Sequence, residues 1–89
     1  MTGLSAQIQH KGLNYYVQTQ DLGQRASYVE SLIYRSGTLL TSRKTMYTSY
    51  LGLPDFKEKV ARLMQDQHEK ILRDISEGRF DHFLTPGEK

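Results

Sequence analysis

The chain has 89 residues and contains no cysteine, no tryptophan and only two prolines. Without cysteine, neither disulfide bonds nor thiolate metal sites can stabilise a small fold, so the packing of apolar side chains must do so. No apolar run approaches the ~20 residues that a membrane-spanning helix requires. The first residues also lack the basic and apolar regions of a signal peptide. Together these absences predict a cytoplasmic protein.

The charge of the chain is small and unevenly distributed. The formal net charge is +2, and the excess of basic over acidic residues lies within 1–53. A protein dedicated to nucleic acid usually carries a denser basic stripe. The length predicts a single domain over 1–89, with enough apolar side chains for two packed layers.

Residues 54–77 have the spacing of a long amphipathic helix. Acidic residues precede basic ones by four positions, as in Glu58/Arg62 and Asp66/Lys70, and each such pair stabilises a helix by ~0.3–0.5 kcal/mol. The opposite side carries an apolar stripe, made of Phe56, Val60, Leu63, Met64, Ile71, Leu72 and Ile75.

The ends of this helix have recognisable signals. Pro54 suits the first helical position; alternatively Asp55 caps the helix and Glu58 completes a capping box. Gly78 suits the C′ position after the helix. Because the helix is longer than a strand of eight residues, we expect it to cross the sheet diagonally or to overhang it.

The part before the helix reads as four strands, at about 5–10, 13–20, 27–35 and 38–47. Lys11-Gly12 predicts a two-residue turn between the first two. This turn sets a register in which both strands place apolar groups on one face. The predicted pairs are His10 with Leu13, Ile8 with Tyr15, and Ala6 with Val17.

Ser36-Gly37 predicts the turn of the second hairpin. Two registers are possible for this hairpin. A two-residue turn places Val29, Ile33, Leu40 and Met46 on one face, and we prefer it for that reason. A type I turn with Gly37 in a bulge would shift every pairing by one residue. The preferred pairs are Ile33 with Leu40, Ser31 with Ser42, and Glu30 with Arg43.

The predicted fold is therefore α+β: a four-stranded antiparallel β-meander with one long C-terminal helix packed on one face. The other face of such a sheet has nothing in the chain to cover it except the apolar segment at 79–84. That segment either folds back on the sheet or is covered by a partner. The candidate interaction surface consists of Tyr16, Tyr28, Leu32, Tyr34, Leu39, Arg43, Tyr47, Phe80 and Phe83.

Aromatic and arginine side chains on an open sheet suit two kinds of partner. They are enriched in protein interfaces, and they can also stack bases and hold phosphates. We rank protein contact first, including contact with a second copy in a homodimer. The alternative is weak binding of single-stranded nucleic acid through Tyr34, Arg35, Arg43, Lys44 and Tyr47.

Signals of catalysis and of metal or cofactor binding are missing. His68-Glu69 lacks the second histidine that the metalloprotease helix motif needs at position 72. His10, His68 and His82 fall on different elements and are expected to be ordinary surface or edge histidines. The chain has no nucleophile elbow and no glycine-rich phosphate loop. We therefore expect a non-catalytic protein without catalytic residues, cofactor or metal.

Three segments carry a resemblance to known proteins. HKGLNYYVQTQDLG, VESLIYRSGTLLTSRKT and LMQDQHEKILRDISEGRFDHFL together resemble a group of short uncharacterised bacterial proteins, over about His10 to Leu84. The resemblance implies a bacterial, cytoplasmic setting and implies no activity.

Overall fold

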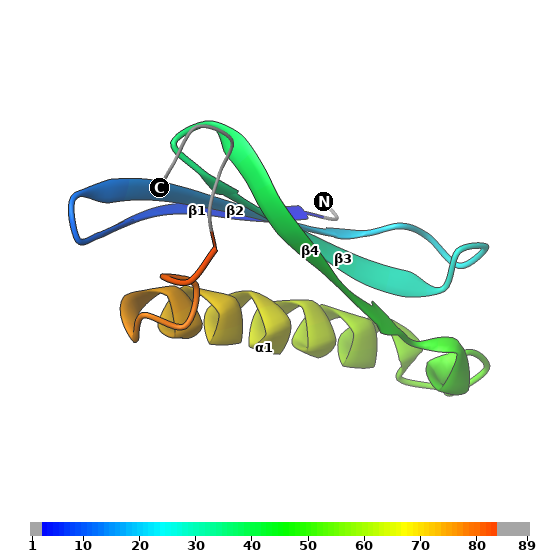
Figure 1. Cartoon of the computed structure of the whole chain (residues 1–89). Helices are drawn as coiled ribbons and strands as arrows, with labels where there is room; N and C mark the ends of the chain where they lie inside the picture. The colour runs from blue at the N-terminus through cyan, green and yellow to red at the C-terminus, as the bar shows by residue number, and fades with distance from the viewer. Residues whose placement is uncertain (1–2, 84–89) are drawn as a thin grey trace.

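The computed structural model describes residues 3–83 and has the predicted α+β architecture. Four antiparallel strands form one open sheet in the order β1-β2-β3-β4, and a single long helix lies on one of its faces (Figure 1). In the described residues no helix is long and apolar enough to cross a membrane. The elements are β1 (Gly3–His10), β2 (Leu13–Asp21), β3 (Tyr28–Arg35), β4 (Thr38–Met46), η1 (Thr48–Tyr50) and α1 (Phe56–Ser76).

The first hairpin has the predicted register. Lys11 and Gly12 have φ angles of 54° and 79°, the left-handed values that a two-residue hairpin turn requires. β1 begins at Gly3, two residues before the expected start. The observed pairs include His10 with Leu13, Ile8 with Tyr15, and Ala6 with Val17, all as predicted.

The second hairpin has the predicted two-residue turn but not the predicted register beyond it. Tyr34 pairs with Leu39, as this turn demands, but Ile33 pairs with Thr41 because a bulge follows. Leu40 is the additional residue, and its half-buried side chain packs against the core. The predicted pairs Ile33–Leu40, Ser31–Ser42 and Glu30–Arg43 are therefore wrong by one residue: Ser31 pairs with Arg43, and Glu30 pairs with Lys44.

The bulge reverses which side chains of β4 face the helix. Since successive strand residues point to opposite faces, one additional residue turns every later side chain over. Arg43 and Tyr47 consequently face α1, although they were expected to point outward. Met46 was expected in the core and is instead 60% exposed on the opposite face.

The helix begins and ends within three residues of the prediction. Asp55 occupies the N-cap position, but its side chain makes no capping hydrogen bond, so neither the Pro54 start nor the capping box is formed. At the other end Gly78 has the expected positive φ of 82°. The Gly78 and Arg79 N–H groups donate to the Ile75 and Asp74 carbonyls, at 3.0 and 2.9 Å. This is a Schellman motif, and it turns the chain back toward the sheet.

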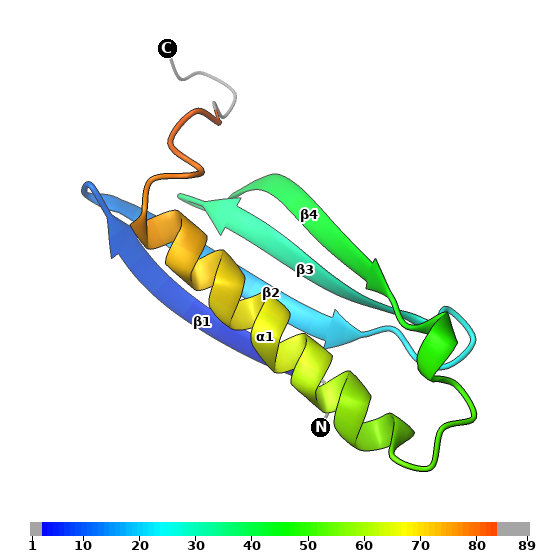
Figure 2. The same ribbon diagram turned by 90° about the horizontal axis from the view of Figure 1, so that it is seen from below.

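Two apolar clusters form the core between α1 and the sheet. Figure 2 shows α1 running along β1 and β2, with its first turns extending past the start of β1. The helix therefore overhangs the sheet, as its length predicted. One cluster contains Tyr15, Val17, Ile33, Ile71, Ile75 and Phe80. The other contains Val29, Tyr47, Val60 and Met64.

Candidate functional site

The face of the sheet opposite α1, here called the outer face, is rich in tyrosine and poor in charge. Among residues 3–83, the outward strand positions carry two charged side chains, Glu30 and Lys44, which pair across β3 and β4. The Lys44 ammonium lies 4.7 Å from the centre of the Tyr28 ring, in the range of a cation–π contact. The two charged positions of the outer face thus lie opposite each other on β3 and β4, and the other outward strand positions within residues 3–83 are uncharged.

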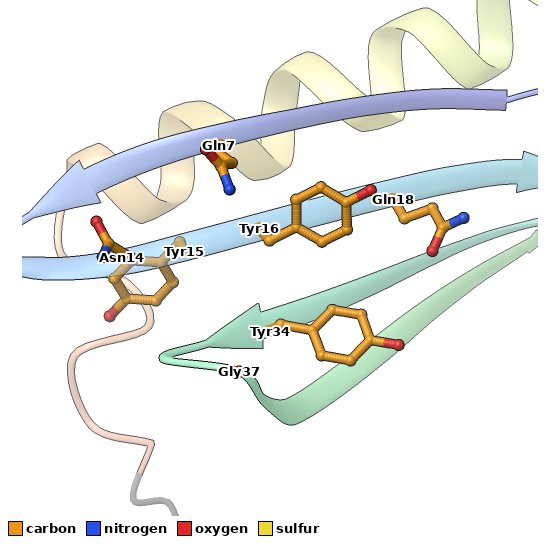
Figure 3. Close-up of a pocket in the computed structure, with 7 residues that line it drawn as sticks. All are labelled: Gln7, Asn14, Tyr15, Tyr16, Gln18, Tyr34 and Gly37. Atoms are coloured by element: carbon orange, nitrogen blue, oxygen red, sulfur yellow. The ribbon is translucent and has the colours of Figure 1, made fainter.

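The two middle strands carry a shallow hollow around two tyrosines, toward the end of the sheet that holds the hairpin turns (Figure 3). Tyr16 of β2 and Tyr34 of β3 are paired in the sheet, and their ring centres are 6.0 Å apart at an interplanar angle of 46°. The hollow has a volume of about 350 Å³, and the amides of Gln7, Asn14 and Gln18 line it. Phenol and amide groups both donate and accept hydrogen bonds, so the hollow suits a neutral, polar surface.

Five of the predicted surface residues lie together on this face. Tyr16, Tyr28, Leu32 and Tyr34 are half-buried, and Leu39 at the edge is 50% exposed. Their side chains come from three neighbouring strands. Tyr16, Leu32, Tyr34 and Leu39 occupy neighbouring outward positions, and Glu30 and Lys44 separate them from Tyr28.

Tyr47 and Arg43 are not part of this surface. Tyr47 is fully buried; its ring meets Phe56 edge-on at 5.7 Å, and its hydroxyl donates to Asp21 Oδ1 at 2.5 Å. Burial, together with this hydrogen bond, raises the pKa of Tyr47 to about 12. Arg43 Nη1 lies 3.2 Å from Asp74 Oδ2 of α1, with its guanidinium 5.1 Å from the Phe80 ring centre.

The segment after α1 folds back onto the helix side of the sheet. Phe80 is 2% exposed within the first core cluster, and the half-buried Phe83 stacks on it at 5.6 Å. Arg35 holds this segment by donating to the Phe80 and Phe83 carbonyls. Phe80 and Phe83 therefore pack within their own chain, the first of the two expected alternatives; Leu84 lies outside the described residues.

These positions show whether the five residues predicted to bind nucleic acid lie on one face. Of its five residues, Tyr34 and Lys44 face outward, whereas Arg35, Arg43 and Tyr47 lie on the helix side. The outer face consequently keeps one cation of the three that were expected to hold phosphates. Phosphate contacts dominate the affinity for nucleic acid. Because two of the three cations lie on the other face, the nucleic-acid site expected from the sequence is not assembled on the outer face.

A polar cluster, unforeseen in the sequence, lies inside the interface between helix and sheet. His68 is 6% exposed, although it was expected to be a surface histidine. Its Nδ1 lies 2.8 Å from Thr19 Oγ1, and Thr19 Oγ1 lies 2.7 Å from Ser31 Oγ. Gln67 Nε2 donates to Ser31 Oγ at 2.8 Å, and Thr45 Oγ1 donates to Gln67 Oε1 at 2.5 Å. Neighbouring hydrogen bonds thus join α1 to β2, β3 and β4.

This buried polar cluster joins elements of the fold, and its Thr19, Ser31 and His68 side chains are closed to solvent. A hydroxyl beside a histidine is the arrangement of an activated nucleophile, but Thr19 and Ser31 have no exposed surface, so a substrate cannot reach them. These contacts are compatible with one continuous donor order, from Thr45 through Gln67, Ser31 and Thr19 to Nδ1 of a neutral His68 that carries its proton on Nε2. Protonation of Nδ1 would break that order.

The free energy of unfolding is expected to fall in mild acid because of His68. Burial lowers the pKa of His68 below its ordinary value of 6.5, and the Glu69 carboxylate opposes this shift more weakly. Between the folded and unfolded pKa values the unfolded chain binds more protons, so stability rises with pH there. The contribution is complete above pH 6.5 and is lost progressively as the pH falls through the folded pKa.

Urea unfolding at a series of pH values tests this, with His68→Asn as the comparison, because asparagine can keep a hydrogen bond to Thr19. The variant should lose less stability than the parent on acidification below pH 6.5. An NMR titration of the His68 ring should give an inflection below 6.5. An inflection at or above that value would contradict the prediction.

A charged cluster closes the other end of the interface. The Asp74 carboxylate has 5% exposed side-chain surface and lies within 3.5 Å of nitrogens of Arg43, Lys70 and Arg79. Burial alone would raise the pKa of Asp74, but the hydrogen bonds and charges of Arg43 and Lys70 hold it below its ordinary value of 3.8. In the part of the chain that the structure describes, no three histidine or acidic side chains converge as metal ligands would.

Comparison of the chain with models of protein families, with curated proteins and with solved structures gave no match. The resemblance to short bacterial proteins accordingly stays an expectation.

Proposed function

We propose that the protein is a non-catalytic interaction module that binds another protein through its outer face. The observation that carries this proposal is the group Tyr16, Leu32 and Tyr34, at the centre of a face that no segment within residues 3–83 covers. Tyrosine supplies a large contact area together with a hydroxyl for hydrogen bonding, and it is enriched at the energetic centres of interfaces. A central aromatic group beside polar side chains is the usual anatomy of an interface.

The charge of the outer face favours a protein over a nucleic acid. Lys44 is its one outward cation in the described residues; it lies opposite Glu30 in the strand register, and its ammonium contacts the Tyr28 ring. A strand of nucleic acid would find aromatic rings there but little to neutralise its phosphates. Titration with a labelled single strand at low salt should therefore show no binding, and binding that weakens steeply with salt would contradict the proposal.

Removing the two central rings should abolish most of the affinity for the protein partner. A tyrosine at the energetic centre of an interface contributes about 2 kcal/mol, which is roughly 30-fold in affinity, so Tyr16→Ala/Tyr34→Ala is expected to weaken binding by about 30-fold for each ring and up to roughly 1,000-fold in all. Arg62→Ala, on the exposed side of α1, is the control and should leave binding unchanged.

Site-specific photo-crosslinking identifies the partner used in that measurement. A photoreactive residue at Leu39, which is 50% exposed on the outer face, should capture a defined protein in the cells that make this chain. The same residue at Ala61 on the exposed side of α1 should not. Equal capture from both positions, or unchanged affinity of the double tyrosine variant, would refute the outer face as the binding surface.

A further inference from the structure

The two edge strands of the sheet differ in how they are protected. Exposed edges of sheets recruit further strands, and proteins usually prevent this with charges, proline or bulges. β4 carries a bulge together with Arg43 and Lys44. β1 has none of these features: Gly3–His10 contains no lysine, arginine, acidic residue or proline, and it pairs with β2 in one unbroken register. The edge of β1 is therefore regular and unprotected.

The free edge of β1 also leaves apolar surface incompletely covered. On the helix side Leu4, Ala6 and Ile8 are half-buried, while the intervening Ser5 and Gln7 are exposed on the outer face. Leu4 and Ile8 pack against the two core clusters from the edge of the sheet. An additional strand beside β1 would complete their burial.

We propose that β1 pairs with β1 of a second copy, antiparallel about a twofold axis at Ala6, to give a continuous eight-stranded sheet. Residues opposite each other in antiparallel strands share a face, so Leu4 lies opposite Ile8 and Ala6 opposite its own copy, all on the helix side. Ser5 lies opposite Gln7 on the outer face. The strand is thus complementary to itself, and no like charges meet.

The position of α1 is compatible with this pairing. The helix contacts β1 and β2 and runs along them, and adjacent strands lie ~4.8 Å apart. A helix below the space between β1 and β2 would therefore lie about 10 Å from its copy across the axis, close to the 8–10 Å of packed helices. The two helices meet side by side without having to move.

The flank of α1 that faces the axis carries a suitable side chain. Gln67 and Asp74 bond to side chains of β4 and mark the opposite flank. Leu72 is turned about 140–160° from both around the helix, and it is half-buried against the first core cluster. In the dimer Leu72 lies near its own copy below Ala6, so helix packing adds to strand pairing.

The protected edge explains why the assembly stops at two copies. A contact between identical edges about a twofold axis is closed, whereas an edge that paired with a different edge would continue into a fibre. The bulge and charges of β4 prevent that second kind of contact. The outer face of the dimer is then twice as wide and stays open to the partner proposed above.

The lack of cysteine makes a direct test simple. Opposed residues in antiparallel strands have Cα atoms ~4.5–5.5 Å apart, within the range of a disulfide. Ala6→Cys should therefore form a disulfide-linked dimer under mild oxidation, whereas Ser42→Cys, on the outward side of β4, should stay monomeric on a non-reducing gel. Crosslinking of Ser42→Cys as complete as that of Ala6→Cys would overturn the proposal.

Light scattering on the unmodified chain gives an independent measurement. The expected mass is twice the protomer mass of 10.3 kDa. Gln7→Lys, which adds a charge on β1, should return the protein to a monomer, and Gln20→Lys on the inner strand β2 should not. A monomer at every concentration would refute the dimer. Tyr16→Ala/Tyr34→Ala should keep the dimer. The proposed dimer and the proposed binding surface on the outer face can therefore be refuted independently.

Discussion

Tyr47→Ala is expected to lower the free energy of unfolding by about 3–5 kcal/mol, the usual cost of removing a buried aromatic ring. Tyr47 is fully buried, its ring contacts Phe56, and its cluster includes Val29, Val60 and Met64. Since small domains are stable by only about 5–15 kcal/mol, the variant should be close to unfolding at physiological temperature. Urea unfolding followed by circular dichroism measures the loss.

Tyr28→Ala is the matched control, because it removes the same side chain from the outer face. It should cost about 1 kcal/mol or less, since Tyr28 is half-buried and loses mainly its contact with Lys44. Tyr47→Phe should fall between the two, because it keeps the ring and loses one hydrogen bond to Asp21. Similar losses for the two alanine variants would mean that Tyr47 is not in the core.

Phe80→Ala is expected to have a comparably large effect, about 3–5 kcal/mol, although the residue lies beyond the last helix. Its side chain is 2% exposed among Tyr15, Ile71 and Ile75, and the Arg43 guanidinium lies against its ring. The free energy of unfolding from urea titration again gives the loss. The result would show that the segment after α1 is part of the folded core.

His82→Ala is the control for Phe80→Ala, because it substitutes an exposed residue in the same segment. His82 is exposed, and exposed substitutions usually change stability by no more than about 0.5 kcal/mol. If Phe80→Ala cost as little as His82→Ala, the segment would not be packed as the structure has it.

The sequence alone was sufficient to predict an element and its register where two local signals agreed. In the first hairpin the alternation of apolar residues and the two-residue turn at Lys11-Gly12 require the same register, and the structure has it. The apolar stripe of α1 was identified for a similar reason, because one side of the helix carries nearly all the charge. Fold class and sheet order followed from these elements and their short connections.

The second hairpin could be predicted only as far as its bulge. Leu39 and Leu40 are consecutive apolar residues and Thr41 is compatible with either face, so the alternation carries no information at that point. The side chains of Leu40 and Thr41 both ended on the helix side, half-buried. Every residue after them was consequently assigned to the wrong face, which explains the errors at Arg43, Met46 and Tyr47.

The buried polar cluster was missed for a different reason. His68 has helical spacing with Met64, Ile71 and Ile75, which is the signal that places it in the core. A histidine can be buried only if its polar atoms find partners. The partner of the His68 ring, Thr19, lies 49 residues earlier, and the bonds of Gln67 in the same cluster span 22 and 36 residues; the sequence of the helix alone does not reveal these partners.

The additional residue in β4 also makes the chain sensitive to changes of length. Deleting one residue from 38–41 would remove the bulge and restore the simple alternation of side chains between the two faces. Along the remainder of β4, side chains that now face the helix would point outward, and those that now point outward would face the helix. Met46 would then enter the interior, while Arg43 would leave Asp74 with one partner fewer and Tyr47 would turn to water. The loop that joins β2 to β3 has no such coupling, because a residue inserted there leaves both neighbouring strands in phase. Within this hairpin, the number of residues determines the face of each side chain more than their chemical identity does.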